Sequence, residues 1–160
     1  MTPESFRSDV IDPTLKLLDL YSPAASDLML GTALVESKLI HRRQLGGGPA
    51  RGLFQIEPAT FRDVYGRYLK NKPRLLGIVN SLLTDAGVAP VEQLYLNDRF
   101  GCAIARIRYL YDPKPLPDAD DIEALAAVWV RVYNAGGAGT VSKFVNAWKK
   151  GMNNELPNHS

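Results

Sequence analysis

The chain has 160 residues, of which 46% are hydrophobic and 22% charged, a composition typical of a globular domain and unlike disordered or disulfide-rich chains. A chain of this length buries about two thirds of its surface on folding. Its 19 Lys and Arg against 17 Asp and Glu give a net charge of +2, without a dense basic tract. We therefore expect one globular domain over 1–160 that binds no nucleic acid.

The sequence has no feature of a membrane anchor, a leader or a metal site. Its longest apolar run, Ala124 to Val130, is far shorter than the ~20 residues of a membrane span, and no apolar stretch follows the N-terminal residues. We expect neither a signal peptide nor membrane insertion. His41, His159 and the single cysteine, Cys102, are too few for a zinc site, so no metal and no cofactor is predicted. Cys102 falls in an apolar helical pattern that predicts a buried, inert thiol.

Apolar residues recur at helical spacing along most of the chain, and alternating strand patterns are missing. The fold class is therefore all-α. Prolines, capping residues and glycines delimit about seven helices, over 12–21, 23–38, 58–69, 75–83, 98–111, 120–133 and 141–150. The helix over 120–133 is expected to be the central one. Basic residues and a glycine run predict that 40–56 is a loop with at most a minor extended segment.

Glu36 is the first candidate for catalysis. It ends a largely apolar face of the helix over 23–38, beside Met29 and Ala33. Loss of solvent around a carboxylate favours its protonated form, which a general acid requires. The alternative is an ordinary exposed glutamate at a helix end, because glutamates are mostly solvated.

Two further clusters offer groups that bind ligands. In Gly52–Ile56, followed by Pro58 and Thr60, one neutral amide lies among apolar residues and needs partners or a ligand. The same segment would serve equally well as a loop that covers the core. Tyr133–Gly136 ends a helix and offers an aromatic ring and hydrogen-bonding groups, or else a common asparagine and glycine helix stop.

The order of these clusters is more specific than any one of them. Glu36 with Ser37, then Gly52–Ile56, then Tyr133–Gly136 resembles the signature of the soluble lytic transglycosylases, which share the lysozyme-like fold with goose-type lysozymes. The resemblance implies a lysozyme-like fold with an active-site groove, in which Glu36 is the catalytic acid and base. It also implies that peptidoglycan glycan strands are bound by Ser37, Leu53, Phe54, Gln55, Ile56, Tyr133 and Asn134. Phenylalanine stands at position 54 where the family often has methionine.

One catalytic carboxylate is sufficient for the reaction of that family. Glu36 would protonate the glycosidic oxygen of the MurNAc-β-1,4-GlcNAc bond and then accept the C6 hydroxyl proton, giving a 1,6-anhydro-MurNAc end. Hydrolysing glycosidases usually need two carboxyl groups. The hydrolytic alternative is a goose-type muramidase in which Asp63 or Asp98 holds a water. From their positions at helix starts and caps, we interpret both of these acids, and likewise Glu57 and Glu92, as structural.

Other classes of protein are weaker alternatives. A catalytically silent wall-binding virion protein is one such alternative, and the intact Glu36 argues against it. A compact chain without wall-binding repeats resembles bacteriophage-encoded forms, which implies action on the periplasmic cell wall during infection or host lysis, and contact with other virion proteins. A DNA-binding module is disfavoured because the arginines follow no recognition-helix pattern. We expect attraction of anionic stem peptides by Arg42, Arg43, Arg51, Arg62 and Arg67.

Overall fold

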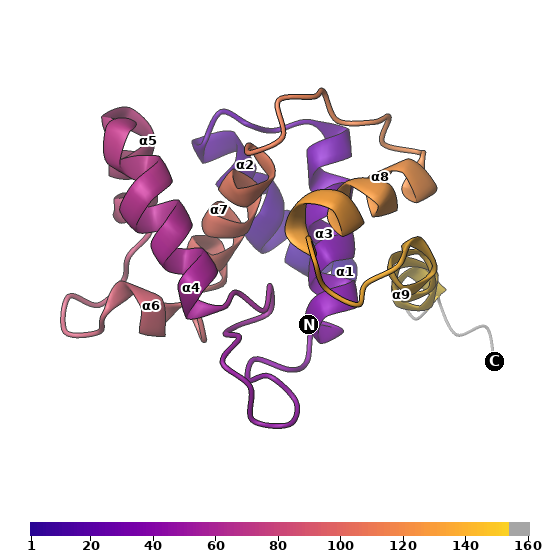
Figure 1. Ribbon diagram of the computed structural model, residues 1–160, viewed down its shortest axis with the longest axis horizontal. Coiled ribbons are helices and arrows are strands. Elements are labelled where there is room, and N and C mark those ends of the chain that lie inside the picture. Colours follow the sequence, from indigo (N-terminus) through magenta and orange to yellow (C-terminus); the bar gives the residue numbers. More distant parts are fainter. Residues whose placement is uncertain (154–160) are drawn as a thin grey trace.

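The computed structural model describes residues 1–153, which form an all-α structure (Figure 1). Its helical segments, with π and 3₁₀ turns labelled η, are α1 (Pro3–Phe6) with η1 (Arg7–Ile11) and α2 (Asp12–Leu17), α3 (Pro23–Ser37), α4 (Pro58–Phe61) with η2 (Arg62–Tyr68) and η3 (Leu69–Asn71), α5 (Pro73–Ser81), α6 (Pro90–Gln93), α7 (Asp98–Tyr109), α8 (Ile122–Val128) with η4 (Trp129–Tyr133), and α9 (Val141–Asn153). Grouped in this way there are eight continuous segments in the described part, one more than predicted, because a single turn, α6, forms where a connector was expected.

Most helix starts follow the predicted local chemistry. Ser22 caps α3 by accepting a hydrogen bond from the Ala25 amide, and Asn97 caps α7 in the same way. Each cap satisfies an amide at the helix start that has no partner within the helix. The cap of α8 is Asp121.

The first helix begins at Pro3 and not at residue 12, so that boundary was wrong. Thr2 and Ser5 form a reciprocal capping box that starts α1. Pro13 was taken as a helix start, but it lies inside a continuous helix, directly after the π turn η1. A proline lacks the amide that would donate within the helix, and the wider turn accommodates the lost bond.

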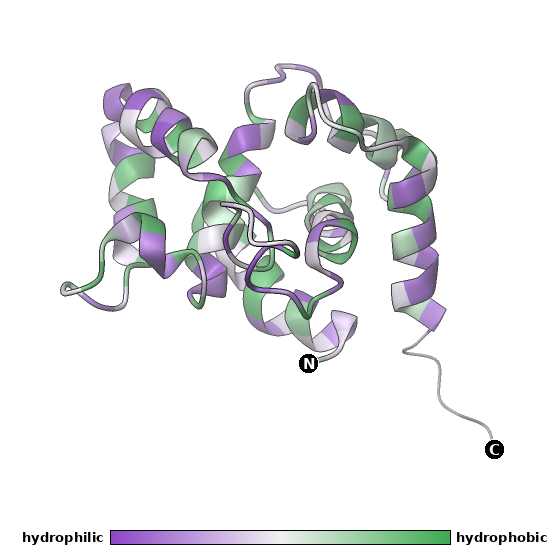
Figure 2. Ribbon diagram, turned by 60° about the horizontal axis from the view of Figure 1, so that its bottom comes forward, coloured by the Kyte–Doolittle hydropathy of each residue, from purple (hydrophilic) through white to green (hydrophobic). Residues whose placement is uncertain are grey.

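The core centres on α3 and α7. Both helices are buried on most of their surface, whereas Glu123 and Arg131 on the helix over 122–133 are exposed. The prediction that this later helix is central was therefore wrong. The buried hydrophobic residues of the described chain form one connected cluster. Figure 2 shows hydrophilic and hydrophobic residues alternating along α9, the helix that precedes the grey C-terminal trace.

The loop between α3 and α4 contains two isolated β-bridges, Arg43 with Arg51 and Arg51 with Ile56. This agrees with the predicted minor extended segment, and no strand forms within residues 1–153. Cys102 is fully buried, as predicted, and burial raises the pKa of its thiol. Every helix in the described range is too short or too polar to cross a lipid bilayer. His159 lies outside the described residues.

Candidate active site

The three predicted clusters meet at one cavity of about 330 Å³, between the end of α3, the start of α4 and the end of η4. Five of the eight predicted site residues line it, namely Glu36, Gln55, Ile56, Tyr133 and Asn134. The rest of its wall is made by Glu57, Thr60, Arg108, Ala135, Gly136 and Gly137. Residues that are far apart in the sequence thus share a single concave surface.

Glu36 is half-buried and has a strongly perturbed acidity. Burial raises the pKa of its carboxyl from an ordinary 4.5 to about 7, and the nearby charge of Glu57 adds to this increase. The indole of Trp129 donates a hydrogen bond to Glu36 Oε2 at 3.1 Å, which lowers the pKa in part. Near neutral pH the carboxyl therefore exists in both protonation states, as a group that acts first as acid and then as base must.

Trp129 is a functional residue that the sequence analysis missed. Its ring is buried and packs at 5.9 Å against Phe144 of α9, so its helical spacing suggested a core residue alone. A buried indole N–H usually has an acceptor, and that requirement was the available signal. The acceptor is Glu36, a residue 93 positions earlier in the chain.

Tyr133 joins η4 to the loop before α4. Its hydroxyl donates to the Phe54 carbonyl oxygen at 2.5 Å, and its ring stacks on that of Tyr109 with 5.3 Å between centroids. Tyr109 is held in turn by a 2.8 Å hydrogen bond between its hydroxyl and that of Thr32. Burial raises the pKa of both tyrosines, so the Tyr133 hydroxyl stays neutral. Because the Tyr133 hydroxyl proton is donated to the Phe54 carbonyl oxygen, the hydroxyl oxygen is left to accept a hydrogen bond from a ligand.

Gln55 has a backbone conformation that is uncommon outside glycine, with φ of 48°. Its side-chain nitrogen donates to the Gly52 carbonyl at 2.9 Å and to the His41 carbonyl at 3.2 Å, so both amide protons are used. No hydrogen bond within residues 1–153 involves its Oε1 atom. The Gln55 side chain thus holds the loop together and also leaves a hydrogen-bond acceptor at the cavity. The sequence had left open whether this segment covers the core or binds a ligand, and the side chain is placed for both roles.

Three of the predicted substrate-binding residues lie behind the cavity wall. Ser37, Leu53 and Phe54 are buried and do not line the cavity. The Ser37 hydroxyl lies 2.6 Å from the Leu53 carbonyl oxygen and accepts from the Leu39 amide at 3.2 Å, and it makes no hydrogen bond to Glu36. These residues fix the loop against the end of α3 and position the groups that face the cavity.

Gly52 allows this loop to approach α6 closely. Its φ is 76°, and a Cβ atom at this position would lie 1.9 Å from the Leu94 carbonyl oxygen. Only glycine fits both conditions. The Gly52 amide also donates to the Arg42 carbonyl at 2.7 Å, which fixes the turn that presents Gln55.

The acids considered as a second catalytic carboxylate differ in their surroundings. Three are engaged away from the cavity: Asp63 accepts from the Tyr111 hydroxyl at 2.6 Å, Asp98 from Arg42 at 2.6 and 3.0 Å, and Glu92 from Arg51 at 3.0 Å. Glu57 occupies the N-cap position of α4, but its side chain makes no capping hydrogen bond and lines the cavity. The interpretation as a structural acid therefore fits the first three, and for Glu57 it stays a prediction.

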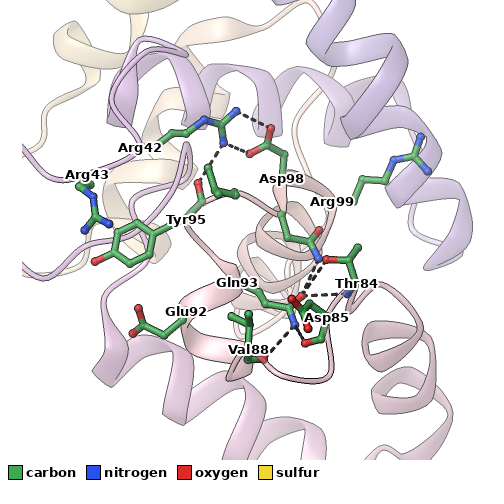
Figure 3. Close-up of a pocket in the computed structure, with 12 residues that line it drawn as sticks. Arg42, Arg43, Thr84, Asp85, Val88, Glu92, Gln93, Tyr95, Asp98 and Arg99 are labelled. Carbon is green, nitrogen blue, oxygen red and sulfur yellow. Dashed lines mark hydrogen bonds and ion pairs between the residues drawn. The ribbon is translucent and has the colours of Figure 1, made fainter.

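A larger cavity of about 760 Å³ lies between loop 40–56, α6 and the start of α7. Figure 3 shows Arg42 directed at Asp98 and at the Tyr95 carbonyl, and Gln93 within a network of neighbouring polar groups. The Arg43 guanidinium lies over the Tyr95 ring at 4.3 Å. The polar groups that line this larger cavity thus largely form hydrogen bonds and ion pairs with one another. None of the eight predicted site residues lines this cavity.

Comparison of the chain with models of protein families, with curated proteins and with solved structures finds no match. The cavity is therefore the feature from which function is inferred. Its features are a half-buried acid with a pKa of about 7, a second carboxylate, and acceptor groups on two walls.

Proposed function

We propose that this protein is a peptidoglycan lytic transglycosylase with a lysozyme-like fold. It cleaves the MurNAc-β-1,4-GlcNAc bond with Glu36 as general acid and then base, and leaves 1,6-anhydro-MurNAc ends. The observation that carries the proposal is the Glu36 carboxyl, with a pKa of about 7, in the one cavity where the three sequence clusters meet.

The reaction needs one proton donor that is protonated again within the same turnover. Protonated Glu36 gives its proton to the glycosidic oxygen, and the C1–O bond breaks while the N-acetyl group of the substrate stabilises C1. The Glu36 carboxylate then takes the proton of the C6 hydroxyl, whose oxygen bonds to C1 and closes the anhydro ring. Trp129 stabilises the transient carboxylate by its hydrogen bond to Oε2. Glu36 ends the cycle protonated, and no water is consumed.

Substrate contacts come from the two walls that flank the acid. Gln55 Oε1 and the Tyr133 hydroxyl oxygen are fixed acceptors for sugar hydroxyl or amide groups. Both are held by hydrogen bonds to backbone carbonyls, so little ordering is needed when the sugar binds. Asn134 completes the same wall.

A hydrolytic muramidase is the second candidate function, and the position of Glu57 favours it specifically. Glu57 lines the cavity with Glu36, and its charge influences the pKa of Glu36. Two carboxyl groups on one cavity are the usual arrangement of hydrolysing glycosidases. In this mechanism Glu57 accepts a proton from the water that attacks C1, and Glu36 protonates the leaving oxygen.

The biological setting that we propose is the bacterial cell wall in the periplasm. We propose that the enzyme opens the wall during bacteriophage infection or lyses the host at its end. Peptidoglycan is then the main partner, with other virion proteins where the enzyme is carried in the particle. A silent wall-binding protein would share the cavity but release no fragments.

The deciding experiment is mass spectrometry of the fragments released from purified peptidoglycan. We expect anhydro-muramyl ends, each one water lighter than a reducing end, from the wild-type protein and from Glu57→Gln, and none from Glu36→Gln. Glu123→Gln is the matched control, because Glu123 is an exposed glutamate on α8. Reducing ends that disappear in Glu57→Gln would establish the hydrolase instead, and absence of any fragments would contradict both.

A further inference from the structure

Arg108 is a half-buried arginine at the catalytic cavity without an acidic partner. It lies in the last turn of α7, and its guanidinium lies over the Tyr111 ring, 4.6 Å from the centroid. Within residues 1–153 the guanidinium makes no hydrogen bond and no ion pair, although Glu36 and Glu57 line the same cavity. A planar guanidinium with unused donors is suited to bind a carboxylate through two parallel hydrogen bonds.

Three other partly buried arginine side chains and the exposed Arg131 are paired with carboxylates of the chain. These pairs are Arg7 with Asp27 at 2.9 Å, Arg42 with Asp98 at 2.6 Å, Arg51 with Glu92 at 3.0 Å, and Arg131 with Asp112 at 2.6 Å. Arg106 is also unpaired, but it lines neither the catalytic cavity nor its neighbour. Arg108 is therefore distinguished by having free donors at the catalytic cavity.

A second cavity of about 370 Å³ adjoins the catalytic one, since both are lined by Arg108 and Ala135. Its wall also contains Lys114, Arg131 and Asp112. Asp112 is occupied, because it accepts from Arg131 at 2.6 Å and from the Lys114 amide at 3.0 Å. Among the residues that line this second cavity, Asp112 is thus paired with Arg131, and the positive charges of Arg108 and Lys114 are not balanced by another carboxylate.

We propose that Arg108, assisted by Lys114, is a subsite for a carboxylate on the C3 substituent of muramic acid. This inference rests on the proposed function, because that function places a muramic acid ring between Gln55 and Tyr133. Its C3 substituent must then leave the catalytic cavity, and the adjoining cavity offers a path past Arg108. The carboxylate belongs either to the stem peptide or, where the peptide has been removed, to the lactyl group.

The subsite is tested by calorimetric binding in a Glu36→Gln background, which prevents turnover. The probes are a GlcNAc-MurNAc-peptide, the peptide-free GlcNAc-MurNAc and the uncharged chitobiose. Arg74→Gln is the control, since Arg74 is exposed, lines neither cavity and loses the same charge. We expect Arg108→Gln to weaken binding of a carboxylate-bearing probe by about 10-fold to 100-fold, the range for a charge-assisted hydrogen bond, and to leave chitobiose binding unchanged.

The two muramic acid probes identify the source of the carboxylate. An effect confined to the peptide-bearing probe assigns it to the stem peptide. An effect confined to the peptide-free probe assigns it to the lactyl group, whose carboxyl is an amide when the peptide is attached. Equal weakening of chitobiose binding, or no difference from Arg74→Gln, would overturn the subsite. Lys114→Gln, at an exposed position, provides a second variant that does not disturb the core, and it should weaken the same probe several-fold.

Cleavage by the wild-type protein is measured separately, so that the two proposals fail in different ways. Cleavage of peptidoglycan without Arg108-dependent binding would overturn the subsite and leave the proposed function. Binding that depends on Arg108, without cleavage of any glycan, would overturn the proposed function and support the carboxylate subsite.

Discussion

Replacement of Glu36 by glutamine should change how the stability of the protein depends on pH. The amide keeps the size of the carboxyl and still accepts the Trp129 hydrogen bond through its oxygen, but it does not titrate. In the wild type the pKa of Glu36 is about 7 in the folded state against an ordinary 4.5. Below the lower value both the folded and the unfolded states are protonated, so the two proteins should then be similarly stable.

Between these two pKa values the folded wild type retains a proton that the unfolded chain has released. Its free energy of unfolding therefore falls as pH rises, by about 1.4 kcal/mol per pH unit. The accumulated loss is about 3 kcal/mol above the folded pKa of about 7. Glu36→Gln lacks this loss, so it should be more stable than the wild type by up to this amount at alkaline pH.

The assay is urea unfolding of both proteins at a series of pH values, with the difference in their free energies of unfolding as the readout. Taking this difference removes the contribution of titrating groups that the two proteins share. A difference that stays constant from about pH 4 to about pH 8 would show that Glu36 has an ordinary acidity. A difference of opposite sign would show that the folded protein prefers the carboxylate, and either result would refute the reasoning.

Three further predictions concern the neighbours of the acid. Trp129→Phe removes the indole donor that lowers the pKa of Glu36, so that pKa should rise above about 7, as followed by carbon-13 NMR of the labelled carboxyl; an unchanged titration would contradict the role of the donor. Glu57→Gln removes a charge that raises the same pKa, and the Glu36 titration should move to lower pH. Gly52→Ala places a Cβ atom 1.9 Å from a carbonyl oxygen, and its cost should exceed the about 1–2 kcal/mol of a left-handed alanine. Gly46→Ala is the control, because Gly46 has φ of 83° and open space around it; equal thermal unfolding of the two variants would disprove the close approach.

Local signals in the sequence predicted much of the fold and part of the site. The start of α3 follows from Ser22 and Pro23, whose capping chemistry acts within one turn. The apolar face that ends at Glu36 correctly indicated a desolvated carboxylate. The signal in these two cases lies in neighbouring residues. For Gln55 and Tyr133 the resemblance to a family signature implied a shared groove, and both residues line the same cavity.

Long-range contacts explain what the sequence did not show. The bond from Trp129 to Glu36 spans 93 positions, and no local pattern indicates such a partner. Glu57 does lie at the predicted helix start, but no local pattern indicated that its side chain also lines the cavity. Pro13 misled because a proline that follows a widened turn within a helix has the same local sequence as one that begins a helix.

The π turn η4 separates the donor that contacts the acid from the tyrosine on the opposite wall. Trp129 begins this turn and Tyr133 ends it, and the Asn134 amide closes it by bonding to the Trp129 carbonyl five positions earlier at 2.8 Å. Deleting one residue here would restore α-helical hydrogen bonding and rotate everything that follows by about 100°. Trp129 would keep its place beside Glu36, while Tyr133 would turn away from Phe54. The extra residue thus sets the angular register between the indole that contacts Glu36 and the hydroxyl that contacts Phe54. This stretch should tolerate substitutions far better than insertions or deletions.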